Sequence, residues 1–186
     1  MKIAPLPGEG LRLALEIDEA AMLDQLVTQL TQLLQSYSQT ALDPDPLFAS
    51  LEVGGSEEPP EDPALARLFP DAYEEPADAA SYRRVTEQGL VNRKLQDAMR
   101  VTADLGLGAG VPADADSVEV EITADSLPAW ARTVTALRLA MAARIGLDEP
   151  GDHDRLLEQE STRGTVLVFD WLAAILDSVL AVTQEL

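Results

Sequence analysis

Hydrophobic and polar residues alternate in two short stretches of the chain. Residues 11–17 place leucine or isoleucine at every second position, and residues 118–122 alternate valine or isoleucine with glutamate. A period of two puts the apolar side chains on one face of a β-strand. Each stretch leads directly into a helical pattern, so we expect two strand-to-helix units whose strands pair into a small sheet.

Four longer stretches repeat apolar residues at spacings of three and four, which is the period of an amphipathic helix. The pattern predicts helices near residues 18–37, 78–105, 125–145 and 165–183. The expected fold class is therefore mostly α, a helical domain of four main helices with a small two-stranded β-sheet. In the last helix only four of the eighteen residues 165–182 are polar, which indicates a central helix or an interface helix.

Proline and glycine residues mark the limits of these helices. Asp62 followed by Pro63 predicts a short additional helix, because aspartate is a good N-cap and proline fits the first turn; Pro70 then ends it. Gly89 lies inside the 78–105 pattern and weakens a helix by about 1 kcal/mol relative to alanine, so we expect close packing or a break there. Gly106 follows the pattern and is expected to terminate the helix.

The chain is long enough for one core and short for two, so we expect a single domain over residues 1–186. Two polar segments separate the predicted helices. They are an acidic loop rich in proline and glycine over residues 38–62 and a polar loop over residues 147–163.

The composition limits the kinds of partner. Aromatic residues are only 4%, so aliphatic side chains must fill the core, which suits helices better than sheets. The formal net charge of -20 repels phosphate backbones and anionic membranes, so we expect no direct binding to nucleic acid or membranes. The acidity is compatible with a protein partner, and it is also explained by solubility alone.

We expect a cytoplasmic protein. The sequence contains no cysteine, which excludes a disulfide, a thiolate nucleophile or a cysteine-ligated metal in these 186 residues. Two prolines and a glycine within residues 5–8 interrupt the N-terminal segment before an apolar run forms, so we expect no signal peptide. Residues 165–182 are interrupted by Asp170 and Asp177 and are short for a bilayer span.

No motif in the sequence indicates a catalytic site. His153, the only histidine, has no accompanying nucleophile motif and is expected to be solvated in a loop. The glycines of residues 106–110 follow a helix and precede a strand, which reverses the order of a dinucleotide-binding loop. Residues 114–119 lack the glycine and the third acidic ligand of a calcium loop. We therefore expect no enzyme activity, cofactor or metal.

One segment is basic within this acidic chain. Residues 81–101 contain five positive and two negative residues, a local charge of +3 that leaves -23 for the remainder. The segment is either a docking surface for an acidic partner or nucleic acid, or it is neutralised by the chain's own acidic loops at high effective concentration. The candidate partner-binding residues are Arg83, Arg84, Arg93, Lys94 and Arg100.

Asp170 shares one face of the last helix with Asp177 and several alanines. This stripe is either water-facing, or it brings Asp170 against an arginine of the preceding helix. Arg138, which is set between two leucines, is the best candidate for such a structural ion pair. Removing one partner of a buried pair should cost about 3 to 5 kcal/mol, mostly by stranding the other charge.

Several short segments resemble a known family. They are residues 62–73 (DPALARLFPDAY), residues 137–139 (LRL) followed by 144–146 (RIG), and residues 170–172 (DWL). Together with the strand-to-helix start, they resemble an actinobacterial domain-of-unknown-function family. Some of its members are described as AosR-type oxidative-stress transcriptional regulators. The resemblance spans nearly the whole chain, and residues 62–73 are its most specific part.

The resemblance implies a helical, intracellular protein with no established enzyme activity, whose gene often neighbours that of the ClpS proteolytic adaptor. The AosR description implies regulation through a protein partner in transcription, sensed through cysteine oxidation. This sequence departs from that pattern because it has no cysteine, so a disulfide switch cannot operate within it. The resemblance supplies no catalytic residues.

Two functions from different classes remain open. The first is a regulatory protein that binds another protein, within the transcription machinery by resemblance. The second is a small-ligand binder or enzyme that uses carboxylates and arginines, such as Asp170 and Arg138, in a helical core. A pocket in which both groups converge would favour the second, whereas a filled core and an exposed apolar face would favour the first.

We also expect a homodimer. The last helix is more apolar than one face of a small domain usually needs. Neither residues 10–18 nor residues 117–123 contain a proline, which is a common device for blocking a sheet edge. A symmetric dimer would satisfy both surfaces, although a charge of -20 per chain opposes it.

Overall fold

A computed structural model describes residues 1–6, 10–38, 58–107 and 116–184 of the chain. The mostly helical fold class is confirmed, and the four predicted main helices are present, with the largest difference in bounds at the start of the last one. Parts of the predicted acidic loop and glycine segment, residues 39–57 and 108–115, lie outside the described residues. The elements in chain order are β1 (Lys2–Leu6), β2 (Gly10–Glu16), α1 (Ile17–Tyr37), α3 (Pro63–Leu68), α4 (Pro76–Leu105), β3 (Ser117–Thr123), α5 (Leu127–Ile145), α6 (Asp152–Glu158) and α7 (Glu160–Gln184).

The sheet is antiparallel, with the strand order β1-β2-β3. In the register of β2 and β3, Leu11 lies opposite Ile122 and Leu13 lies opposite Val120. All four side chains are at most 1% exposed. The alternation of apolar and polar residues therefore predicted both strands, their pairing and the face that is buried.

The expected two-stranded sheet is wrong by one strand. β1 pairs with β2 along its whole length, with Pro5 opposite Leu11. A proline lacks the backbone N–H that a central strand needs, but an edge strand tolerates it. Because β1 and β3 flank β2, residues 10–18 do not form the free sheet edge that the sequence led us to expect.

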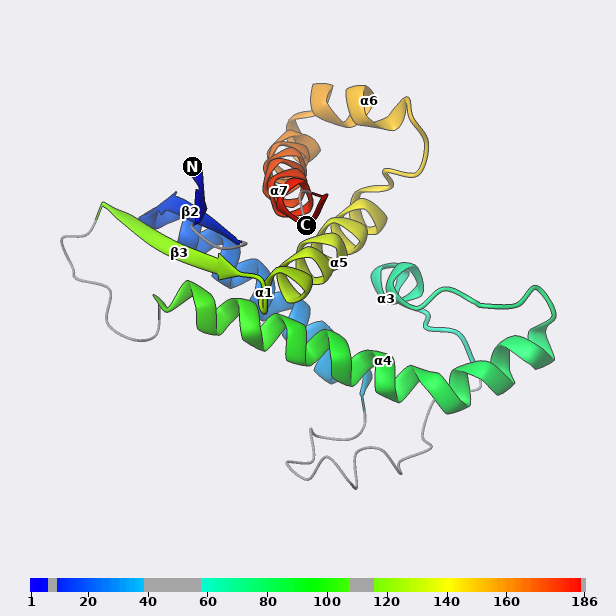
Figure 1. Cartoon of the computed structure of the whole chain (residues 1–186). Helices are drawn as coiled ribbons and strands as arrows, with labels where there is room; N and C mark the ends of the chain where they lie inside the picture. Colours follow the sequence, from blue (N-terminus) through cyan, green and yellow to red (C-terminus); the bar gives the residue numbers. More distant parts are fainter. Residues whose placement is uncertain (7–9, 39–57, 108–115, 185–186) are drawn as a thin grey trace.

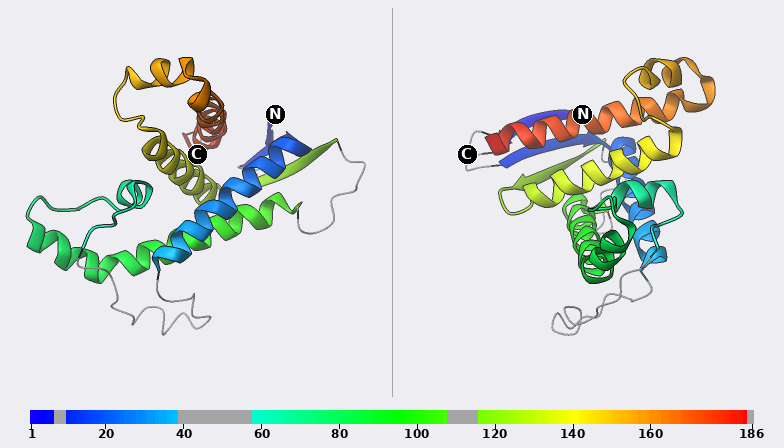
Figure 2. Two further views of the ribbon diagram at one scale, coloured as in Figure 1. Left: turned by 180° about the vertical axis from the view of Figure 1, so that it is seen from behind. Right: turned by 90° about the vertical axis from the view of Figure 1, so that its right-hand side faces the viewer.

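The central helix is α5. It packs against α1, α3, α4, α7 and β3, and Figure 1 shows it between α4 on one side and α7 on the other. α1 crosses α4 (Figure 2, left). The prediction that the last helix could be central is wrong, since α7 lies at the periphery, beside α5 (Figure 2, right).

The segment between α5 and α7 is more regular than the predicted polar loop over residues 147–163. Residues 152–158 form α6, and α7 begins at Glu160, five residues before the apolar pattern. Only Leu156 of α6 is buried, at 2% exposed. One buried residue leaves no apolar periodicity in the sequence, which is why the pattern did not predict this helix.

α7 is long as well as apolar. By length and composition alone, the stretch Glu160–Val182 could cross a membrane, and its mean hydropathy is 2.0. The expectation that this segment is short for a bilayer span is therefore wrong. Only 22% of its most apolar window is buried. Asp170 and Asp177 lie within this stretch, and each would cost about 2.5 to 3.5 kcal/mol near the centre of a membrane-spanning helix.

α4 runs without interruption through Gly89, so the expected break is wrong. A Cβ built at Gly89 has nothing within 4 Å, so close packing does not explain this glycine either. α4 ends as predicted at Gly106, whose φ of 64° is left-handed, a conformation that glycine adopts readily.

Two glycines give opposite expectations for stability. At Gly10 an added Cβ would lie 2.6 Å from the Ile122 backbone oxygen and 3.3 Å from the Thr123 Cα, and neither backbone atom can move without disturbing β3. Gly10→Ala should therefore lower the free energy of unfolding by about 1 to 3 kcal/mol.

Gly89→Ala should raise the free energy of unfolding by roughly 0.5 to 1 kcal/mol, because alanine is the better helix former. Urea denaturation of both variants measures the two shifts; a stable Gly10→Ala variant would contradict the tight β2–β3 approach.

Candidate functional site

The fold separates the five cations of the basic segment of α4. The side chain of Arg83 is only 8% exposed and pairs with Asp71. The Nε of Arg100 donates a hydrogen bond to Oδ1 of Asp104 at 2.9 Å. Both guanidinium groups therefore lie against carboxylates of this chain, which reduces the charge they offer to a partner.

The remaining cations are Arg84, Arg93 and Lys94. Arg84 and Arg93 are exposed, and Lys94 is half-buried. The Lys94 ammonium lies 5.6 Å from the centroid of the Phe69 ring, a cation–π distance. Burial lowers the pKa of Lys94 below its usual value, and the nearby Asp97 carboxylate opposes this change.

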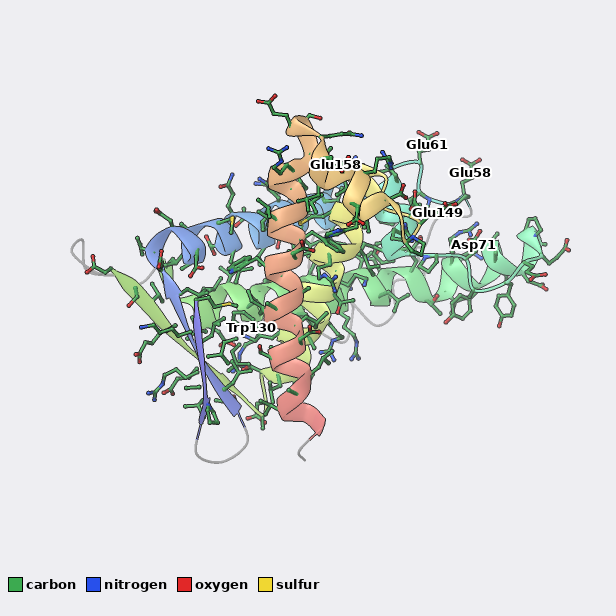
Figure 3. All side chains as sticks on the ribbon, turned by 90° about the horizontal axis from the view of Figure 1, so that it is seen from above. Glu58, Glu61, Asp71, Trp130, Glu149 and Glu158 are labelled. Carbon is green, nitrogen blue, oxygen red and sulfur yellow. The ribbon has the colours of Figure 1, made fainter. Side chains whose placement is uncertain are left out.

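Two polar links join α4 to α5. Nε1 of the fully buried Trp130 donates to Oδ2 of Asp104 at 2.9 Å. Arg132 donates two hydrogen bonds, at 2.7 and 2.8 Å, to the two carboxylate oxygens of Asp97. These bonds to Asp97 raise the pKa of Arg132. The links hold the last turns of α4 beside the start of α5, where the two helices cross (Figure 3).

The structure does not form the predicted ion pair between Arg138 and Asp170. The Arg138 guanidinium lies over the Phe169 ring at 4.3 Å from its centroid, and its buried Nε has no hydrogen-bond partner in the described part of the chain. Asp170 is 46% exposed and contacts His153 instead. Neighbouring residues on a helix point about 100° apart, so α7 directs Phe169, rather than Asp170, toward α5.

His153 lies in α6 and not in a solvated loop. Its Nε2 lies 3.0 and 3.1 Å from the two carboxylate oxygens of Asp170, and its Nδ1 lies 3.4 Å from Oδ1 of Asp154. The hydrogen bond to Asp170 is the main reason that the pKa of His153 is raised, with Asp154 adding to the effect. The contact links α6 to α7, and nothing in the spacing of residues 153 and 170 predicts it.

Sequence analysis also missed a set of polar groups buried between α1 and α4. The Tyr37 hydroxyl donates to Oε1 of Glu87 at 2.7 Å, and Nε2 of Gln88 donates to Oγ of Ser38 at 3.0 Å. Burial, followed by the bond to the Glu87 carboxylate, raises the pKa of Tyr37. These bonds join the last residues of α1 to α4, which is a structural role.

Several carboxylates lie on the side of the molecule that carries α3. Figure 3 labels Glu58, Glu61, Asp71 and Glu149 there, away from Trp130. Among the described residues, no group of three or more histidine, aspartate or glutamate side chains is arranged to hold a metal ion.

One small apolar cavity lies between α1, α3, α5 and α7. Its volume is about 210 Å³, and leucine and methionine side chains of α1 and α5 are half of the residues that line it. Arg144 also lines it, but its guanidinium donates to Asp62 at 2.6 Å. Asp62 in turn accepts hydrogen bonds from the backbone of Ala64 and Leu65 as the N-cap of α3. The polar groups at this cavity therefore hold α3 against α5.

The contact of His153 with Asp170 predicts a pH dependence. Because its folded pKa is raised above the unfolded value of about 6.5, the contact stabilises the fold fully below that value and is lost as pH rises through the folded pKa. NMR titration of the single histidine should give a midpoint above about 6.5 in the native protein. Asp170→Asn should lower this midpoint, because Asp170 is the main cause of the shift.

Asp177→Asn is the matched control, since Asp177 is exposed on the same helix. It should leave the His153 midpoint nearly unchanged. Equal midpoints in the native protein and the Asp170→Asn variant would contradict the α6–α7 contact.

Comparison with known proteins identifies the family of this chain. The family model DUF2017, described as a domain of unknown function, matches residues 3–183. The chain is also similar to a Mycobacterium leprae (strain TN) protein named "Putative oxidative stress regulator AosR", with 31% identity over 153 residues, 77% of this chain and 69% of that protein. No solved structure matches the chain. Since the family model covers nearly all of the sequence, the chain belongs to the DUF2017 family.

Proposed function

We propose that this protein is a non-enzymatic regulator in the cytoplasm that acts by binding another protein, in transcription or in the stress response. The observation that carries the proposal is the similarity to the Mycobacterium leprae protein, whose name describes a stress regulator and of which the chain covers 69%. A net charge of -20 favours a protein partner over direct contact with nucleic acid or an anionic membrane.

Redox sensing is assigned to the partner rather than to this chain. The 186 residues contain no cysteine, so they cannot form a disulfide or a sulfenic acid.

The alternative function, a small-ligand binder or enzyme, has less support. It required Asp170 and Arg138 to converge in one pocket, but Asp170 contacts His153 and Arg138 lies over Phe169. The apolar cavity beside Arg144 has a volume of about 210 Å³. Neither Asp170 nor Arg138 lines this cavity, so protein binding is the better-supported function.

The proposal predicts a specific partner in the native host. A chromosomally tagged chain, purified before and after oxidant treatment, should carry a component of the transcription machinery in near-stoichiometric amount. Deleting the gene should change the transcripts induced by the oxidant, and the unmodified chain should restore them. A tagged chain that enriches no protein above an untagged control, with unchanged transcripts in the deletion strain, would contradict the proposal.

We further propose that the chain forms a homodimer through α7. Leu167 and Leu180 are 56% and 41% exposed, and Trp171 on the same helix is half-buried. At about 100° per residue, Leu167 and Trp171 share one face of α7, and the exposed Asp170 and Asp177 point to one side of it. A contact centred on Leu167 and Trp171 therefore leaves both aspartates at its margin.

Light scattering at micromolar protein and physiological salt should give twice the 20.0 kDa mass of one chain. The dimer should weaken at low salt, because the repulsion between the two acidic chains then extends over about 30 Å rather than about 10 Å. Leu167→Glu should favour the monomer, whereas Val85→Glu, on an exposed residue of α4, should not. A mass of one chain at every salt concentration would contradict self-association.

A further inference from the structure

Beyond the two polar links, the contact between α4 and α5 opens into a groove. It lies toward the start of α4 from the Arg132–Asp97 pair and has a volume of about 300 Å³. We call it the α4–α5 groove. The residues that matter here are Leu90, Arg93, Lys94, Arg132, Ala136 and Leu139.

The α4–α5 groove has an apolar interior. Leu90 is 44% exposed, and Leu139 is half-buried at the margin of the core. A leucine that is left this exposed beside a concave surface gains free energy when another apolar side chain covers it. The volume is at the lower end of the range for small-molecule sites, which suits one or two large side chains of a peptide better than a cofactor.

Two cations, Arg93 and Lys94, line the groove. Neither Arg93 nor Lys94 takes part in an ion pair with any described residue, whereas Arg83, Arg100 and Arg132 on the same two helices do. Asp97, the nearest candidate, already accepts both of its hydrogen bonds from Arg132. In a chain of net charge -20, two unpaired cations beside an apolar groove are a local positive site.

We infer that the α4–α5 groove docks a short acidic segment of a protein partner, with an apolar side chain against Leu90 and Leu139 and carboxylates paired with Arg93 and Lys94. The inference rests on the proposed function and identifies the surface through which it would operate. It also separates Arg93 and Lys94 from the other cations of the basic segment.

Charge favours a peptide over a nucleic acid as the occupant. A long polyanion would meet the repulsion of the whole acidic chain, whereas a segment with two or three carboxylates interacts mainly within the screening length of about 8 Å. Burial of the Lys94 ammonium costs free energy, which the Phe69 ring and the nearby Asp97 carboxylate offset in part. A carboxylate of the partner would offset more of it.

The test places a photo-crosslinking amino acid, p-benzoylphenylalanine, at Leu90 of the tagged full-length chain in the native host. The same amino acid at Val85 is the control, because Val85 is exposed on the same helix but does not line the groove. We expect ultraviolet light to crosslink the Leu90 position to a protein segment rich in aspartate or glutamate around an apolar residue. Crosslinks from Leu90 to nucleic acid, or to a segment without acidic residues, would overturn the inference.

Charge reversal gives a second measurement. A synthetic peptide with the crosslinked sequence should bind the Arg93→Glu variant roughly tenfold more weakly than the native chain in fluorescence anisotropy, since an attraction becomes a repulsion. Lys2→Glu makes the same change of charge at an exposed residue of β1 and should leave binding nearly unchanged. Leu90→Gln should weaken binding and Val85→Gln should not, and circular dichroism confirms that each variant is folded.

The outcomes separate the two proposals. If the tagged native chain captures a transcription component but Arg93→Glu captures it equally well, the groove is not the docking surface and the proposed function stands. If the native chain captures no partner at all, the proposed function fails and the inference fails with it.

Discussion

The indole of Trp130, which is fully buried, donates its single hydrogen bond to Asp104, and Asp104 also accepts from Arg100. About two turns earlier in α4, Asp97 accepts both hydrogen bonds from Arg132. These links hold the start of α5 against the last turns of α4, and α5 is the helix on which α1, α3 and α7 also pack. Losing either carboxylate would leave a partner group without its bond, so the position of every other helix depends on this contact.

The sequence predicted those helices and strands in which burial of one face determines the spacing of the apolar residues. The apolar faces of β2 and β3 repeat every second residue because one side of the sheet is buried, and α1, α4 and α5 repeat at helical spacing for the same reason. β1 was missed because Pro5 reads as a breaker, although an edge strand tolerates it. α6 was missed because only Leu156 of this helix is buried.

Charged residues were harder to predict because their partners are determined by helix rotation and not by sequence spacing. Arg83 and Arg93 belong to the same basic segment, yet the first is buried against Asp71 and the second is exposed at a groove. Asp170 does have an ionisable partner, but a rotation of one residue on α7 gives it His153 and gives Arg138 the ring of Phe169. Such differences arise only when the helices are packed, and they decide which cations remain available for binding.

The chain has two tryptophans, and the fold gives them different surroundings. Trp130 is enclosed between α4 and α5 and is bonded to a carboxylate, whereas Trp171 lies half-buried on the peripheral α7. Indole fluorescence responds to the polarity around the ring. Replacing one tryptophan at a time would therefore give two optical reporters within the same molecule. Emission from Trp130 would follow loss of the core, and emission from Trp171 would follow any change at the outer helix.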